Sequence, residues 1–245
     1  MYEDLLNSTA HRDRPLPPGP WVMMQQWEYL LFMHCRLSQQ VVEQYLPPGL
    51  ELDTYDGDAW VSVIPFKVRK LHLRGLPQMP FLNNFLEVNV RTYVKRHGMK
   101  GVYFFGLGTN QLGTVLGARL ATLPYYYADT LMNIQDGVIH FRSERRGKYQ
   151  GILNVDYQPD GEHYHPEKDS LESWLLDRFF LWTYKHGALY RGVIHHKQWE
   201  IQKAQAAMEQ RLLTPFLPNG VSNGNAPAHY AASQTALIWR IQKEK

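Results

Sequence analysis

Residues 86–96 carry the sequence feature that most restricts the fold, because their side chains alternate between two classes. The even positions suit a hydrophobic core: Leu86, Val88, Val90, Thr92 and Val94. The odd positions are Glu87, Asn89, Arg91 and Tyr93. Successive side chains of a β-strand point to opposite faces, so this segment predicts a strand. One of its faces packs on a core, and the other holds a carboxylate, an amide, a guanidinium and a phenol in one row.

The direction of this polar row decides whether it has a function. On a flat sheet the row faces water, which is the usual arrangement. In a sheet that curls on itself the row lines the interior, where a buried Glu87 needs a partner. Arg91 can be that partner, or it can hold the carboxylate of a substrate with two hydrogen bonds. The residues alone leave both arrangements open.

The rest of the chain is rich in strand and turn residues, with 10 Phe, 7 Trp, 15 Tyr, 15 Pro and 18 Gly. Turns are predicted at Asp56-Gly57, His97-Gly98 and Asp136-Gly137. Strands are predicted over residues 21–37, 50–55, 59–69, 86–96, 101–108, 149–157, 190–196 and 235–241. Helices are predicted over residues 39–45, from Asn110 to about 120, 170–184 and 200–213. This order indicates an α+β fold, a mostly antiparallel sheet or barrel with helices packed against it.

The prolines of residues 11–20 predict an extended N-terminal arm over residues 1–20. No linker divides the rest of the chain, so residues 21–245 are expected to form a single domain. The N-terminal aromatic segment has no apolar run longer than Leu30–Met33, which is too short to cross a bilayer. The first residues have no apolar signal core. We therefore expect a cytoplasmic protein that does not contact a membrane.

The sequence lacks the short motifs of nucleotide-binding proteins and of common hydrolases. Its single cysteine excludes an internal disulfide and a cysteine-based zinc site. His163 and His165, beside Glu162 and Glu167, suit a metal only on a strand, and we expect a solvated polar loop there. The adjacent His195 and His196 would point to opposite faces of a strand. We therefore expect neither a metal nor a cofactor.

A basic segment raises nucleic-acid binding as an alternative function. It holds Lys67, Arg69, Lys70, His72 and Arg74. Its charges fall on both faces of the predicted strand, and it lacks the interleaved aromatic residues of single-strand binders. An exposed edge strand protected by charge fits it better. The net charge of +3 permits an anionic partner without requiring nucleic acid.

Several longer runs resemble the YqjF-like family of uncharacterised bacterial proteins, which is distantly related to acetoacetate decarboxylase. The runs are WEYLLFMHCRL (27–37), LPPGLELDTYDGDAWVSVIPF (46–66), FLEVNVRTYV (85–94), GVYFFGL (101–107), ARLATLPYYYA (118–128) and SLESWLLDRF (170–179). The resemblance covers roughly residues 20–241. It implies a cone-like antiparallel β-barrel with helices packed outside and a pocket inside.

The resemblance also implies site residues and one departure. Acetoacetate decarboxylases form a Schiff base on a lysine, assisted by a pocket glutamate and an arginine. The glutamate matches Glu87, but the lysine pair matches Tyr125 and Tyr126, which have no amine and cannot form an imine. No lysine lies between Lys100 and Lys148. Schiff-base decarboxylation is therefore not expected.

What remains is a pocket for a small molecule that contains a carbonyl or a carboxylate. We expect Glu87 and Arg119 as catalytic residues and Asn89, Arg91, Tyr125 and Tyr126 as substrate-binding residues. The extended segment after Pro124 directs only one of the two tyrosines inward, and we favour Tyr125. The sequence does not decide between lyase or enolisation chemistry and ligand binding without turnover. It also leaves open whether the chain forms a homo-oligomer.

Overall fold

The structure is a computed structural model that describes residues 2–77, 83–115, 122–145, 150–211, 213–217, 220–223 and 227–244. Its named helices are α1 (Glu3–Asn7), α2 (Gln39–Glu43) and α4 (Leu171–Leu176). Its strands are β1 (Met23–Leu37), β2 (Glu51–Leu52), β3 (Ala59–Leu73), β4 (Asn84–Arg96), β5 (Met99–Thr109), β6 (Tyr125–Tyr127), β7 (Asp129–Gln135), β8 (Val138–Arg145), β9 (Gly151–Tyr164), β10 (Phe180–Lys185), β11 (Ala188–His195), β12 (Ile201–Arg211), β13 (Gly220–Asn223), β14 (Ala228–Ile238) and β15 (Gln242–Lys243).

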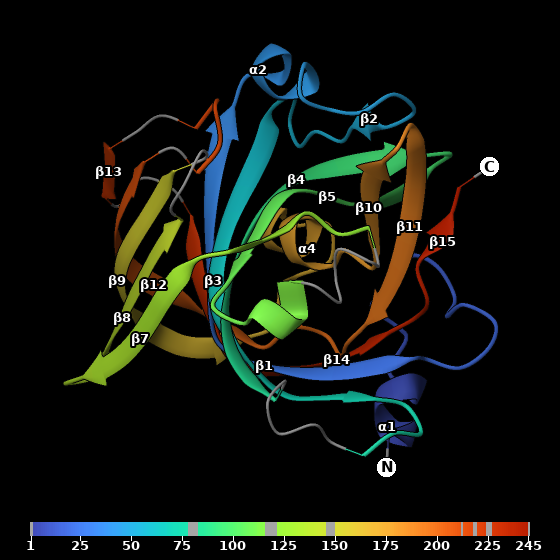
Figure 1. The fold of residues 1–245 in the computed structure, drawn as a ribbon, viewed down its shortest axis with the longest axis horizontal. Helices are drawn as coiled ribbons and strands as arrows, with labels where there is room; N and C mark the ends of the chain where they lie inside the picture. Colours follow the sequence, from blue (N-terminus) through green and yellow to red (C-terminus); the bar gives the residue numbers. More distant parts are fainter. Residues whose placement is uncertain are drawn as a thin grey trace.

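Seven of the strands form a ring, visible in Figure 1 around α4. Their order is β11, β10, β5, β4, β3, β1 and β14, and a pairing of Ile194 with Ile238 joins β11 back to β14. Most neighbours in this order are antiparallel, as predicted, but β10 and β5 are parallel. The ring turns one face of each strand inward, which brings the polar row of β4 to its interior.

A second group of strands covers the outer face of β1, β3 and β4. It continues from β14 through β12, β9, β8 and β7, and it forms the left side of the molecule in Figure 1. Val88 and Val90 pack outward into a core shared with Phe141, Val155 and Met208 of this group. Strand β4 is therefore buried on both faces, which explains why its polar row cannot face water.

The family resemblance implied that the helices pack outside the ring, but helix α4 packs inside it. Its backbone begins after Ser170, whose side chain accepts a hydrogen bond from the N–H of Ser173 (3.2 Å). Leu175 and Leu176 are buried in the same cluster as Ile64, Phe66 and Tyr93 of the ring. The helix lies across the middle of the ring in Figure 1. It thus closes part of the interior instead of covering the outer surface.

One predicted helix is wrong, and a second is confirmed only over its first residues. Residues 200–213 form strand β12 because Ile201–Arg211 pairs along its length with β9. Ala204, Ala206 and Met208 then pack into the outer core, and this burial overrides the helical propensity of the segment. The helix predicted over residues 170–184 ends at Leu176, and Phe180–Lys185 is strand β10.

The hairpin predictions are partly confirmed. His97-Gly98 joins β4 to β5 and Asp136-Gly137 joins β7 to β8, with positive φ at all four residues. The turn at Asp56-Gly57 also forms, but β2 pairs with β4 and not with β3.

The basic segment is not an edge strand, because Lys67 and Arg69 belong to β3 between β1 and β4. Among the described residues, no helix has the length and apolar character needed to cross a membrane.

Candidate functional site

Glu87 lies at the inner face of β4, next to Phe66 of β3 and Thr109 of β5. Only 4% of its surface is exposed. Its carboxylate accepts a hydrogen bond from the hydroxyl of Tyr125 (2.7 Å between Oη and Oε2). Burial raises the pKa of Glu87 to about 7, and the Tyr125 hydrogen bond opposes part of that rise. The carboxyl group therefore exchanges its proton near neutral pH, as a general acid or base must.

Tyr125 reaches Glu87 through strand β6, which pairs in parallel with β5 and places Tyr125 beside Leu107. Tyr125 and Leu107 line the same cavity as Glu87. The pKa of Tyr125 is raised well above its ordinary value, chiefly by burial and also by the carboxylate. The phenol therefore stays protonated, and it can act as a hydrogen-bond donor beside Glu87.

The side chain of Tyr126 points away from the cavity that Tyr125 lines. Its ring lies over Gly106 and Gly108 of β5, where a Cβ at Gly108 would come within 2.9 Å of it. The guanidinium of Arg145 stacks 4.1 Å from the ring centre. Tyr126 is not among the lining residues of the cavity, so the structure does not support its assignment to the site. Arg119, the second predicted catalytic residue, lies outside the described residues.

Asn89 and Arg91 follow Glu87 along the inner face of β4 and line the same cavity. Oδ1 of Asn89 and Nε of Arg91 are buried and have no hydrogen-bond partner within the part of the chain that the structure describes. One Nη of Arg91 donates to the backbone oxygen of Leu175 in α4 (3.3 Å). Buried polar atoms usually have partners, so these two atoms are available to a ligand.

Arg178 is a cavity residue that the sequence analysis missed. Its guanidinium is buried, donates to Asp53 Oδ2 and to the Trp174 backbone oxygen (2.6 Å each), and stacks on the Trp174 ring. Nη2 has no partner among the described residues. Burial lowers the pKa of Arg178 and the Asp53 carboxylate opposes this, so the group remains a cation. The sign of this burial in the sequence is that Arg178 directly precedes the apolar run Phe179–Trp182.

These residues share a cavity of about 670 Å³. Its polar lining is limited, and the remaining wall is mostly aliphatic or aromatic. His196 also lines it, but burial lowers the pKa of that imidazole to about 3, so it is neutral. Three guanidinium groups line the cavity, those of Arg91, Arg178 and Arg240. The carboxyl groups opposing them are Glu87 and Asp53, the partner of Arg178, so the polar part of the cavity is suited to an anion.

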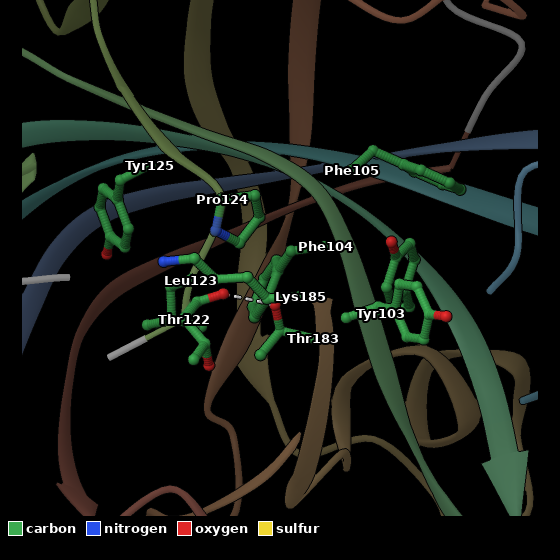
Figure 2. Close-up of a pocket in the computed structure, with 10 residues that line it drawn as sticks. Tyr103, Phe104, Phe105, Thr122, Leu123, Pro124, Tyr125, Thr183 and Lys185 are labelled. Carbon is green, nitrogen blue, oxygen red and sulfur yellow. Dashed lines mark hydrogen bonds between the residues drawn. The ribbon is translucent and has the colours of Figure 1, made fainter. Parts of the chain in front are cut away.

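A second pocket of about 350 Å³ adjoins the cavity and is shown in Figure 2. Both are lined by Phe104, Thr122, Leu123 and Tyr125. The backbone oxygen of Thr122 accepts a hydrogen bond from Oγ1 of Thr183 on β10 (2.7 Å), the dashed line in Figure 2. Lys185 lines this second pocket, whereas the described lining of the larger cavity includes no lysine.

The histidine-rich segment is not the loop that we predicted, because Glu162 and His163 belong to strand β9. Nδ1 of His165 forms a hydrogen bond with the backbone oxygen of Trp199 (2.8 Å). The described residues include no group of three or more His, Cys, Asp or Glu side chains placed to hold a metal ion.

A family model and one curated protein match most of this chain in sequence. The family model DUF2071, described as an uncharacterized conserved protein, matches residues 24–235. The chain is 36% identical over 229 residues to the uncharacterized protein YqjF of Bacillus subtilis (strain 168), covering 93% of this chain and 95% of YqjF. These matches confirm the family resemblance found in the sequence.

Solved structures with a similar fold have low sequence identity. The acetoacetate decarboxylase from Legionella pneumophila superposes with a TM-score of 0.63 at 12% identity, over 98% of this chain and 94% of that chain. The enduracididine biosynthesis enzyme MppR, complexed with pyruvate, superposes with a TM-score of 0.64 at 12% identity, over 94% and 92%. The chain therefore has a mostly β fold of the acetoacetate decarboxylase type.

Proposed function

This chain belongs to the DUF2071 family of uncharacterized conserved proteins, and we propose that it binds a small organic anion with a carbonyl group and moves a proton on it. The single observation that carries this proposal is the hydrogen-bonded pair Glu87–Tyr125 in a cavity that also holds Arg91. The pyruvate complex of MppR, a protein of similar fold, supports the same ligand class. The seven-stranded ring would act as the barrel wall around this ligand.

The proposed step is enolisation without an imine. The Glu87 carboxylate takes a proton from the carbon next to the carbonyl, and the C–H electron pair forms the new C=C bond. The carbonyl π pair moves to oxygen, where the guanidinium of Arg91 or the Asn89 amide N–H donates to the enolate. Tyr125 orients the Glu87 carboxylate by donating to it. Return of the proton from Glu87 restores the substrate.

Deuterium exchange tests this step with a known probe. Pyruvate is incubated with the protein in D2O, and loss of its methyl proton signal is followed by NMR against a protein-free background. We expect catalysed exchange whose rate rises with pH through about 7, as the Glu87 carboxylate forms. Glu87→Gln should abolish the exchange, whereas Glu162→Gln, which changes an exposed glutamate of β9, should leave it intact.

Binding measured by calorimetry separates the two candidate functions. Arg91→Met should weaken pyruvate binding, and Arg211→Met, which changes an exposed arginine, should not. Pyruvate that binds through Arg91 without any exchange would favour the alternative function, ligand binding without turnover. Absence of both exchange and Arg91-dependent binding would contradict the proposal.

A further inference from the structure

The wall of the large cavity is far more apolar than a small keto acid requires. Aliphatic and aromatic side chains from seven strands, from α4 and from connecting segments line it; they include Leu30, Phe32, Leu71, Leu73, Leu181 and Trp239. A cavity of about 670 Å³ lies within the range of drug-sized ligands, whose pockets bury most of the ligand in apolar surroundings. Pyruvate alone would leave most of this apolar wall in contact with water.

Part of the polar lining comes together on one strand, β4, while Gln25, His196 and Arg240 line the cavity from β1 and from the segments after β11 and β14. Glu87, Asn89 and Arg91 are consecutive inward positions of β4. Arg178 joins them, because its guanidinium and that of Arg91 both lie within 6 Å of the Tyr93 ring (5.1 and 5.8 Å). Glu87 lies four strand residues from Arg91, about 13 Å along β4. The ligand head group therefore meets the two cations and the Asn89 amide, and Glu87 lies farther along the same row.

The apolar wall continues past Glu87 along β3. Phe66 is the partner of Glu87, and the lining residues Leu71 and Leu73 come after it on the same strand. Leu73 pairs with Met23 of β1, which in turn pairs with Ile238 of β14, and both of these also line the cavity. The apolar lining thus extends well beyond the polar head site.

We infer that the ligand is a carboxylate with a long apolar body, held with its charged head at Arg91 and Arg178 and its tail along Leu71 and Leu73. This inference rests on the proposed function and names the substrate class of the same site. The tail gains affinity by removing apolar surface from water, both its own and that of the wall. The buried guanidinium groups exclude a ligand without a hydrogen-bond acceptor, because their unpaired N–H groups would stay unsatisfied. A carboxylate is the acceptor that also matches their charge.

A chain-length series of saturated carboxylates tests the inference by calorimetry. The probes are butanoate, hexanoate, octanoate and decanoate, measured below their micelle concentrations. We expect the affinity to rise about fourfold for each added methylene, the ratio given by burial of one CH2 group. Arg91→Met should weaken every member of the series. Butanoate binding that depends on Arg91 but gains less than twofold per methylene would overturn the inference and leave the proposed function standing.

A matched pair of variants locates the tail. Leu73→Trp fills part of the apolar wall, and it should flatten the dependence on chain length and lower decanoate affinity at least tenfold. Leu76→Trp makes the same change at an exposed leucine three residues away, and it should retain the full series. Equal decanoate affinity in the two variants would overturn the tail placement. If no member of the series binds through Arg91, the inference is overturned, whereas the proposed function is decided separately by the pyruvate exchange and binding measurements.

Discussion

Replacement of Glu87 by glutamine should remove a pH-dependent part of the protein's stability. The pKa of Glu87 is raised by burial from 4.5 to about 7 in the folded protein, so between these values the folded state holds a proton that the unfolded state has lost. This contribution to stability is fully present below pH 4.5 and is lost as the pH rises through about 7. A glutamine side chain cannot ionise, so the variant lacks this contribution.

The magnitude is set by the two pKa values. One pKa unit corresponds to about 1.4 kcal/mol, so the wild type should lose roughly 2–3 kcal/mol between pH 5 and pH 8 through this group alone. Denaturant unfolding of wild type and Glu87→Gln at both pH values measures it as the change in their stability difference. Glu162→Gln, at an exposed site, is the control and should give no such change. A stability difference that is the same at pH 5 and pH 8 would refute the account of Glu87.

Three further results are expected. Arg178→Met should destabilise the fold by about 3–5 kcal/mol in denaturant unfolding, because it leaves the buried Asp53 carboxylate without its cation; a loss below about 1 kcal/mol would mean that water already screens this pair. Gly101→Ala should lower the thermal midpoint, because a Cβ there would collide with the Phe180 backbone oxygen across the β5–β10 pairing; an unchanged midpoint would contradict that close approach. Borohydride treatment with acetoacetate should give no adduct by mass spectrometry, whereas a stoichiometric adduct, for instance on Lys185, would show that an amine reaches the ligand.

The strands with strict alternation or dense aromatic content could be predicted from the sequence. Residues 86–96 form β4 with the two faces as expected, apart from a register shift between Val90 and Arg91. The sequence could not show that both faces are buried, because the covering layer is formed by residues far along the chain, such as Phe141, Val155 and Met208. Strand β12 could not be predicted for a related reason. Its alanines and glutamines favour a helix, and the segment is a strand because it pairs with β9.

The candidate site divides in a similar way. The spacing on β4 predicted that Glu87, Asn89 and Arg91 share a face, and the proline before Tyr125 predicted that Tyr125 and Tyr126 diverge. Arg178 was not predicted as a site residue, because its place in the cavity depends on where α4 ends and on a long-range ion pair with Asp53. Its neighbours along the chain gave no sign of that contact.

A crystal structure of the protein grown with pyruvate would show whether the cavity around Glu87 and Tyr125 holds the ligand. We expect density for pyruvate inside the ring, with its carboxylate in hydrogen-bond contact with the Arg91 guanidinium and its methyl carbon facing the Glu87 carboxyl group. Pyruvate bound elsewhere, with the cavity around Glu87 and Tyr125 holding only water, would contradict this expectation.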